Sequence, residues 1–234
     1  MGEKAKTGAV ILAGGQGKRM HSAVQKQYMM LGGKPLIFYA LDAFERSPVD
    51  EIVLVVAPGE EEYARREILA PLHLTKVKAV VAGGKERYHS VYEGLKALTD
   101  CDYVLIHDGA RPLVTGDIIR RAIDGAARYG ACVAAMPVKD TIKVADDNGF
   151  AAATLDRARL WQIQTPQAFS YPLVRGAYDT VMADKSRQAG ITDDAMVVES
   201  CAARHVKLIE GSYENLKVTT PEDLVAAEAF LRRR

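Results

Sequence analysis

A glycine-rich segment follows the first apolar run of the sequence and carries two adjacent cations. The run Ala9–Ala13 leads into Gly14–Gly17, which Lys18 and Arg19 follow directly. Glycines let backbone N–H groups approach a phosphate closely, and neighbouring cations add local positive charge. In open α/β sheets, a strand that ends in such a loop is where nucleotides bind. The segment therefore predicts a nucleotide site, with a tight turn that holds no ligand as the alternative.

The spacing argues against two common nucleotide-binding loops. Arg19 stands where a Walker A loop needs Ser or Thr after its lysine, and the G-x-G-x-x-G pattern of dinucleotide dehydrogenases is missing. Lys26 comes seven residues after Arg19. Two cations on one continuous loop can meet at one phosphate group, whereas a lone lysine is usually solvated surface.

Valine- and isoleucine-rich runs alternate with helix-like stretches along the chain. Near-continuous apolar runs are typical of strands buried on both faces of a parallel sheet. The alternation predicts an α/β, Rossmann-like fold with a mostly parallel sheet flanked by helices, in one domain over residues 1–234. The expected strands are Ala9–Leu12, Ile52–Val56, Val77–Val81, Tyr103–Ile106, Cys132–Met136 and Val206–Ile209. The expected helices are Pro35–Glu45, Glu60–Leu69, Ser90–Leu98 and Asp117–Tyr129, with another beginning at the cap Thr220.

One segment breaks the alternation. Asn148 and Gly149 stand between two short extended runs, Val138–Val144 and Ala151–Leu155. Asn-Gly in this position is a strong hairpin signal. We expect a β-hairpin over about residues 138–160, inserted in the domain either as a flap over the site or as an arm reaching a second subunit.

The overall charge excludes binding driven by a global field. The sequence has 31 basic and 30 acidic residues, which gives a net charge of +1 in 234 residues. We therefore expect neither nucleic acid nor membrane as a partner, and any anionic ligand must be held by a local cluster of cations. Three scattered cysteines without a C-x-x-C pair, and no apolar run long enough for a signal peptide, indicate a cytoplasmic protein.

A series of motifs, each weak alone, follows in one order over nearly the whole chain. Together they resemble the 2-C-methyl-D-erythritol 4-phosphate cytidylyltransferases of the non-mevalonate isoprenoid pathway. Two departures are that Gln25 precedes Lys26, where the family often has proline, and that Lys85 occupies a place where an acidic residue can serve the base. The motifs are Gly14–Met20, Lys26–Tyr28, Gly33–Pro35, Gly83–Val91, His107–Pro112, Pro137–Lys143, Asp156-Arg157, Gln164–Gln167, Thr192–Asp194 and Asn215–Thr219.

The resemblance implies in-line attack of the substrate phosphate on the α-phosphorus of CTP, giving 4-diphosphocytidyl-2-C-methyl-D-erythritol and pyrophosphate, with Mg²⁺. Arg19 and Lys26 then stabilise the transition state at the α-phosphate, while Arg157 and Lys217 grip the incoming phosphate. Asp108 is a candidate metal ligand, although the CTP phosphates hold most of the Mg²⁺. The implied nucleotide-binding residues are Ala13, Gly14, Gly15, Gly17, Gly84, Ser90, Asp108 and Gly109. The implied residues on the alcohol-phosphate side are Arg111, Thr141, Arg157, Thr165, Thr192 and Lys217.

Structural alternatives stay open for several of these residues, and Thr141, Thr165 and Thr192 could each be an ordinary turn or strand residue. Ser90 alone could cap a helix, and Asp108 could be a helix cap or a partner of Arg111. The resemblance also implies a homodimer in which the hairpin arm brings Thr141 and Arg157 to the neighbouring site. Two other functions remain: a ribitol-5-phosphate cytidylyltransferase, which shares the nucleotide half, and a non-catalytic nucleotide-binding module.

Overall fold

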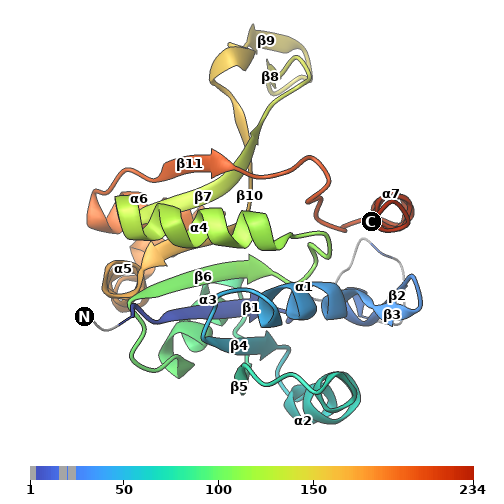
Figure 1. Cartoon of the computed structure of the whole chain (residues 1–234). Helices are drawn as coiled ribbons and strands as arrows, with labels where there is room; N and C mark the ends of the chain where they lie inside the picture. Colours follow the sequence, from blue (N-terminus) through green and yellow to red (C-terminus); the bar gives the residue numbers. More distant parts are fainter. Residues whose placement is uncertain (1–3, 16–19, 21–24) are drawn as a thin grey trace.

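A seven-stranded sheet runs through the centre of the protein (Figure 1). The structure is a computed structural model, and it describes residues 4–15, 20 and 25–234. The strand order is β11-β7-β10-β6-β1-β4-β5, and neighbours pair in parallel except at β10, which is antiparallel to both β6 and β7. The strands are β1 Thr7–Leu12, β4 Glu51–Val56, β5 Val77–Ala82, β6 Tyr103–Asp108, β7 Ala131–Pro137, β10 Trp161–Ser170 and β11 Lys207–Glu210.

Helices cover both faces of this sheet. Helices α1 and α4 share one apolar cluster with the sheet, while α3, α5 and α6 share the other. Helix α7 packs in a third cluster beside the small hairpin β2–β3. The helices are α1 Leu36–Glu45, α2 Glu61–Tyr63, α3 Arg87–Ala97, α4 Gly116–Tyr129, α5 Tyr171–Ala183, α6 Asp194–Ala202 and α7 Pro221–Leu231, and the small hairpin pairs β2 Met30–Leu31 with β3 Lys34–Pro35.

Alternating side chains of the central strands enter the two apolar layers. In β1, Ile11 packs in the cluster that contains Ile37 of α1, whereas Val10 packs in the cluster that contains Leu95 of α3. Successive side chains of a strand point to opposite faces, so a strand covered on both sides must be apolar throughout. The predicted α/β fold with a mostly parallel sheet is confirmed.

The sequence pattern was misleading at the two sheet edges. Strands β5 and β11 were expected to be buried on both faces, but most of their residues are partly or fully exposed. Each lies at an end of the strand order and therefore has one neighbouring strand instead of two. Strand β10 and helices α5 and α6 were not predicted at all.

Two helix predictions also need correction. The stretch Glu60–Leu69 forms only three residues of α-helix before it continues as a π-helical segment, Ala64–Leu69, and a 3-10 turn, Ala70–Leu72. Helix α3 begins at Arg87, three residues before the expected start, because Glu86 caps it in a reciprocal pair with His89. No helix in the described part of the chain combines the length and apolarity needed to cross a membrane.

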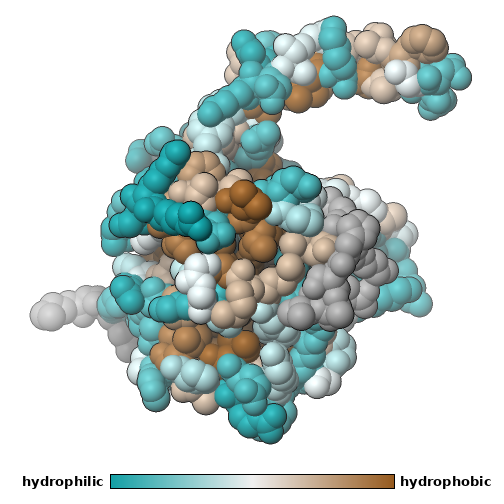
Figure 2. All heavy atoms as spheres, turned by 90° about the vertical axis from the view of Figure 1, so that its right-hand side faces the viewer, coloured by the Kyte–Doolittle hydropathy of each residue, from teal (hydrophilic) through white to brown (hydrophobic). Residues whose placement is uncertain are grey.

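The predicted hairpin is present as an arm that leaves the end of the sheet (Figure 1). Strand β8 (Lys143–Ala145) pairs with β9 (Ala151–Thr154), and a 3-10 turn, Arg157–Arg159, leads back to β10. Gly149 has φ of +84°, a conformation that suits glycine at the tip of a tight hairpin. All residues from 139 to 159 are exposed. Figure 2 shows the arm standing clear of the body, with apolar residues along it.

Candidate active site

A cavity of about 860 Å³ opens where the central parallel strands end. Its walls come from the loops after β1, β4, β5 and β6, which meet at the carboxyl edge of the sheet. Ligands of open α/β sheets bind at this edge. The lining residues are Leu12, Ala13, Gly14, Gly15, Lys26, Gln27, Ala57, Pro58, Gly83, Gly84, Lys85, Glu86, Arg87, Ser90, Asp108, Ala110 and Lys217.

One wall is shaped by close approach of backbone segments. A Cβ atom on Gly14 would lie 3.2 Å from the backbone carbonyl of Val56, and one on Gly84 would collide with His89. The Gly84 N–H donates a hydrogen bond of 3.1 Å to Oγ of Ser90. Ser90 is therefore a wall residue inside the first turns of α3, and the alternative that it caps this helix is wrong.

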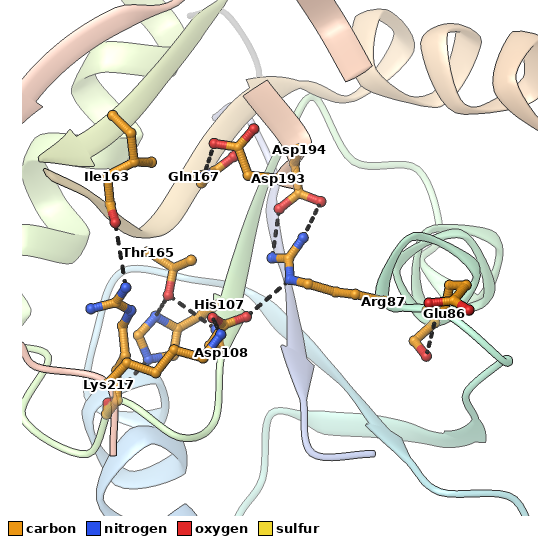
Figure 3. Close-up of polar contacts among 12 residues, drawn as sticks. Glu86, Arg87, His107, Asp108, Ile163, Thr165, Gln167, Asp193, Asp194 and Lys217 are labelled. Carbon is orange, nitrogen blue, oxygen red and sulfur yellow. Dashed lines mark hydrogen bonds and ion pairs between the residues drawn. The ribbon is translucent and has the colours of Figure 1, made fainter. Parts of the chain in front are cut away.

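A chain of alternating charges includes three residues of the cavity lining, Arg87, Asp108 and Lys217 (Figure 3). Arg87 donates two 2.8 Å hydrogen bonds to the carboxylate of Asp194, and its Nε lies 3.2 Å from Oδ1 of Asp108. Nζ of Lys217 lies 2.7 Å from Oδ2 of the same aspartate. The Tyr178 hydroxyl donates a 2.6 Å bond to Asp194, which is fully buried. This chain joins β6, α3, α5, α6 and the segment before α7.

The two cations determine the charge state of Asp108. Burial alone would raise the pKa of this carboxyl, but Arg87 and Lys217 stabilise its ionised form and hold the pKa well below its usual range. Burial likewise opposes the charge of Arg87, and Asp194 and Asp108 overcome it, so the pKa of Arg87 is raised. Asp108 is thus a carboxylate at neutral pH, with each oxygen facing one cation.

A buried histidine supports the end of β6 beneath this chain. His107 is completely buried, and burial lowers its pKa to about 4, so its imidazole is neutral at pH 7. One ring nitrogen lies 3.0 Å from Oγ1 of Thr165, and the other lies 3.3 Å from the carbonyl oxygen of Arg111. Oγ1 of Thr165 also accepts a 3.0 Å bond from the Asp108 N–H. These contacts fix the backbone that carries Asp108.

Arg111 lies behind the cavity rather than on its wall. Its guanidinium donates to the carbonyl oxygens of Asn215, at 2.7 Å, and of Ile163, at 3.5 Å. Its Nε is buried without a hydrogen-bond partner among the described atoms, and burial lowers the pKa of the side chain. The alternative in which Asp108 is a partner of Arg111 holds for the backbone: the Arg111 N–H donates a 2.9 Å hydrogen bond to the backbone carbonyl of Asp108.

The residues expected from the sequence divide into those that share the cavity and those that do not. Gly109 packs inward, and a Cβ there would meet Ile37 at 2.3 Å. Thr192 is exposed just before α6, and Thr141 and Arg157 lie on the arm. Arg19 and Gly17 fall outside the described residues. The expected residues that line the cavity are Ala13, Gly14, Gly15, Lys26, Gly84, Ser90, Asp108 and Lys217.

Two residues of the charge chain were not given a role from the sequence. Arg87 stands within the Gly83–Val91 motif, and Asp194 ends the Thr192–Asp194 motif, but the two are 107 residues apart. The available sequence signal for a role of either residue was its place in a motif. Nothing in the spacing of either motif indicated that they pair.

The fold and the cavity together define a nucleotidyltransferase of the α/β class. The sequence model of 2-C-methyl-D-erythritol 4-phosphate cytidylyltransferase matches residues 7–233. A protein of that name from Lachnospira eligens is 50% identical over 225 residues, which cover 96% of this chain and 98% of the relative. This chain therefore belongs to the family of 2-C-methyl-D-erythritol 4-phosphate cytidylyltransferases.

Solved structures agree with this assignment. The crystal structure of 4-diphosphocytidyl-2C-methyl-D-erythritol synthase from Anaerococcus prevotii matches with a TM-score of 0.84 and 33% identity, over 98% of this chain and 97% of that one. The crystal structure of 2-C-methyl-D-erythritol 4-phosphate cytidylyltransferase from Thermus thermophilus matches with a TM-score of 0.78 and 30% identity, over 97% of this chain and 99% of that one. The similarity thus extends over the arm as well as the sheet.

Proposed function

We propose that this chain joins CTP and 2-C-methyl-D-erythritol 4-phosphate to form 4-diphosphocytidyl-2-C-methyl-D-erythritol and pyrophosphate. The observation that carries the proposal is the shared cavity of Gly14, Gly84, Ser90, Lys26 and Lys217. It combines backbone and hydroxyl groups suited to a nucleoside with cations suited to phosphates. The reaction is an in-line attack of the substrate phosphate on the α-phosphorus of CTP.

Charge neutralisation is the main task of the protein in this reaction. Two anions must meet, and negative charge builds on the oxygens of the α-phosphate as the transition state forms. Lys26 stabilises that charge, together with Arg19. Lys217, which pairs with one oxygen of Asp108 in the structure, turns from that carboxylate to bind the incoming phosphate in the same cavity.

No general base is needed for the attack. A phosphate monoester is already largely a dianion near neutral pH, since its second pKa lies near 6. The histidine nearest to Asp108 in sequence, His107, is neutral, and both of its ring nitrogens contact protein groups. Its position supports a structural role instead of proton transfer.

The described residues offer few protein ligands for Mg²⁺. They contain no group of three or more His, Cys, Asp or Glu side chains suited to a metal ion. Asp108, the candidate ligand, has an ion pair on each of its oxygens. Mg²⁺ prefers phosphate oxygens and waters with few carboxylates. We therefore propose that Mg²⁺ arrives bound to the CTP phosphates, and none of the steps above depends on Asp108 as a ligand.

The functional unit in this proposal is a homodimer. Arg157 and Thr141 are needed to grip the alcohol phosphate, yet both lie on the exposed arm and neither lines the cavity of its own chain. Large apolar side chains are exposed along the arm and its base, which supports burial against a second copy. They are Ile142, Val144, Phe150, Leu155, Trp161 and Ile163.

We also propose that the enzyme works in the cytoplasm. All three of its cysteines are free thiols, and Cys101 and Cys132 are buried. Burial raises the pKa of both thiols to about 12, so they are held as unreactive SH groups. Unpaired, inert cysteines are typical of proteins in a reducing compartment.

Pyrophosphate release tests the proposed reaction directly. Purified protein is given CTP and Mg²⁺ with either 2-C-methyl-D-erythritol 4-phosphate or ribitol 5-phosphate. We expect rapid release with the former and little with the latter. Release with ribitol 5-phosphate alone would support the same transfer chemistry with a different acceptor. No release with either substrate would favour a non-catalytic nucleotide-binding module.

A further inference from the structure

A carboxylate outside the cavity binds one residue before Lys26 and one residue after it. The side-chain amide of Gln25 donates to Oε1 of Glu60, and the hydroxyl of Tyr28 donates to Oε2 at 3.1 Å. Each oxygen of the carboxylate therefore serves one residue, one before Lys26 in the sequence and one after it. Glu60 itself does not line the cavity.

The segment held in this way is a short 3-10 turn, Lys26–Tyr28. The Tyr28 N–H donates to the carbonyl of Gln25 at 2.9 Å, and the Met29 N–H donates to the carbonyl of Lys26 at 3.1 Å. The amide of Gln27 donates to the side chain of Gln25, and Gln27 is only 2% exposed. The side chains on both sides of Lys26 thus converge on one acceptor.

Glu60 is itself fixed by the start of the next helical segment. Its N–H donates to the carbonyl of Ala57 at 3.0 Å, and its own carbonyl accepts from the Ala64 N–H at 2.8 Å. Tyr63, on the same segment, packs edge-to-face against the ring of Tyr28 with centroids 5.1 Å apart. Since Ala57 and Pro58 line the cavity beside Lys26, this carboxylate joins two parts of the same wall.

The environment of Tyr28 makes its hydroxyl less acidic. Burial raises the pKa of Tyr28, and the Glu60 carboxylate raises it further through its charge and its hydrogen bond. The hydroxyl therefore keeps its proton at neutral pH and can donate it to Glu60. A charged acceptor also makes the hydrogen bonds at this point stronger than bonds between neutral groups.

We infer that Glu60 is a positioning residue for Lys26, fixing the turn that aims the lysine at the α-phosphate of CTP. The inference rests on the proposed role of Lys26 in the transfer step. A lysine side chain has several rotatable bonds, so the placement of its Cα sets how often Nζ reaches the developing charge. A displacement of about 1 Å in a catalytic group costs up to about 100-fold in rate.

Steady-state kinetics of Glu60→Ala test the inference. We expect kcat to fall by about 10- to 100-fold, while KM for CTP changes by less than about threefold because Gly84 and Ser90 are untouched. Glu62→Ala is the matched control: Glu62 lies on the same segment, exposed, 3.8 Å from Arg65. Wild-type kcat in Glu60→Ala, or an equal loss in Glu62→Ala, would overturn the inference.

A double-mutant cycle separates positioning of Lys26 from any independent effect. Once Lys26 is alanine, there is no side chain left to position, so adding Glu60→Ala to Lys26→Ala should leave kcat within about twofold. A further 10- to 100-fold loss in the double variant would show that Glu60 acts elsewhere. Measuring Lys26→Ala alone distinguishes the two proposals, because unchanged turnover there removes Lys26 from the mechanism whatever Glu60 does.

Tyr28→Phe keeps the test decisive if Glu60→Ala folds poorly. This variant removes one donor to Glu60 and leaves the ring on Tyr63. We expect a smaller fall in kcat, of about 3- to 10-fold, that also disappears in the Lys26→Ala background. A kcat equal to the wild-type value in Tyr28→Phe would contradict the inference.

Discussion

The charge chain at the sheet edge and the hairpin arm place functional side chains in opposite ways. At the sheet edge, Arg87 and Asp108 hold partners from several elements of the same chain, and Asp194 is fully buried. On the arm, Arg157 donates to the carbonyl of Lys139 at 2.7 Å, within the arm itself, and its surroundings are exposed.

If the proposed homodimer forms, this difference separates the part of the site that one chain builds from the part that needs a second copy. Within the described residues, the proposed nucleotide half of the site is held by packing and ion pairs of a single chain, so it is organised before any ligand arrives. In the proposed homodimer, the alcohol-phosphate half would be complete only where the arm meets the body of the partner. We expect substitutions in the first half to lower the free energy of unfolding of the chain. Substitutions in the second half should weaken the association of two chains.

Removing Asp194 gives the largest expected effect and tests the sheet edge. Asp194→Ala breaks the bidentate pair of the half-buried Arg87 with a fully buried carboxylate, which costs about 3–5 kcal/mol in the free energy of unfolding. Urea denaturation measures this change. Asp179→Ala is the control, because its ion pair with Arg175 is exposed and contributes about 1 kcal/mol or less. Equal losses in the two variants would show that the charge chain is no more than a surface feature.

Subunit complementation tests the arm. Lys26→Ala and Arg157→Ala should each lower kcat by about 10²–10³-fold as pure proteins. In an equal mixture, a heterodimer contains one site with both residues intact, so about a quarter of the wild-type activity should return. Recovery is measured after exchange of differently tagged subunits. If exchange is confirmed and no activity returns, each chain uses its own Arg157.

The buried histidine of the sheet edge gives a pH dependence of intermediate size. The pKa of His107 is about 4 in the folded chain and near 6.5 when unfolded, so the unfolded state binds more protons between these values. Lowering the pH from 7 to 5 should therefore reduce the free energy of unfolding by about 2 kcal/mol. Urea denaturation at both pH values should show a much smaller change in His107→Asn. An unchanged pH dependence in that variant would assign the effect to other groups.

The smallest expected effect on stability is at the tip of the arm. Phe150 is 72% exposed, so Phe150→Ser should change the free energy of unfolding of one chain by less than about 0.5 kcal/mol. The same substitution should weaken dimerisation, because an apolar anchor is lost from the interface. Analytical ultracentrifugation over a range of concentrations measures the latter. A dimer of unchanged affinity would place the interface elsewhere.

The sequence could predict what depends on local pattern. The apolar runs at β1, β4 and β6 marked the buried strands because both faces of each are covered. Asn148-Gly149 marked the hairpin because few other residue pairs adopt that turn. Gly14 and Gly15 after β1 and the cap Thr220 were equally local signals, and the structure places these three where they were expected.

What the sequence could not predict depends on distant partners. Strand β10 was missed because Gln164, Thr165, Pro166 and Gln167 look unlike a buried strand. The polar side chains are buried all the same, since groups remote in sequence satisfy them, as Asn215 does for Gln164. The pairing of Arg87 with Asp194 was missed for the same reason, because the two residues are far apart in the sequence.

In the proposed homodimer, the exposed position of Arg157 would make the activity depend on the concentration of the protein. If each cavity receives this arginine from another copy, an isolated chain holds CTP but lacks part of its grip on the second substrate. Turnover per chain then follows the fraction of chains that are paired, which falls as the protein is diluted below its dissociation constant. Specific activity measured at nanomolar enzyme would report on association as much as on chemistry.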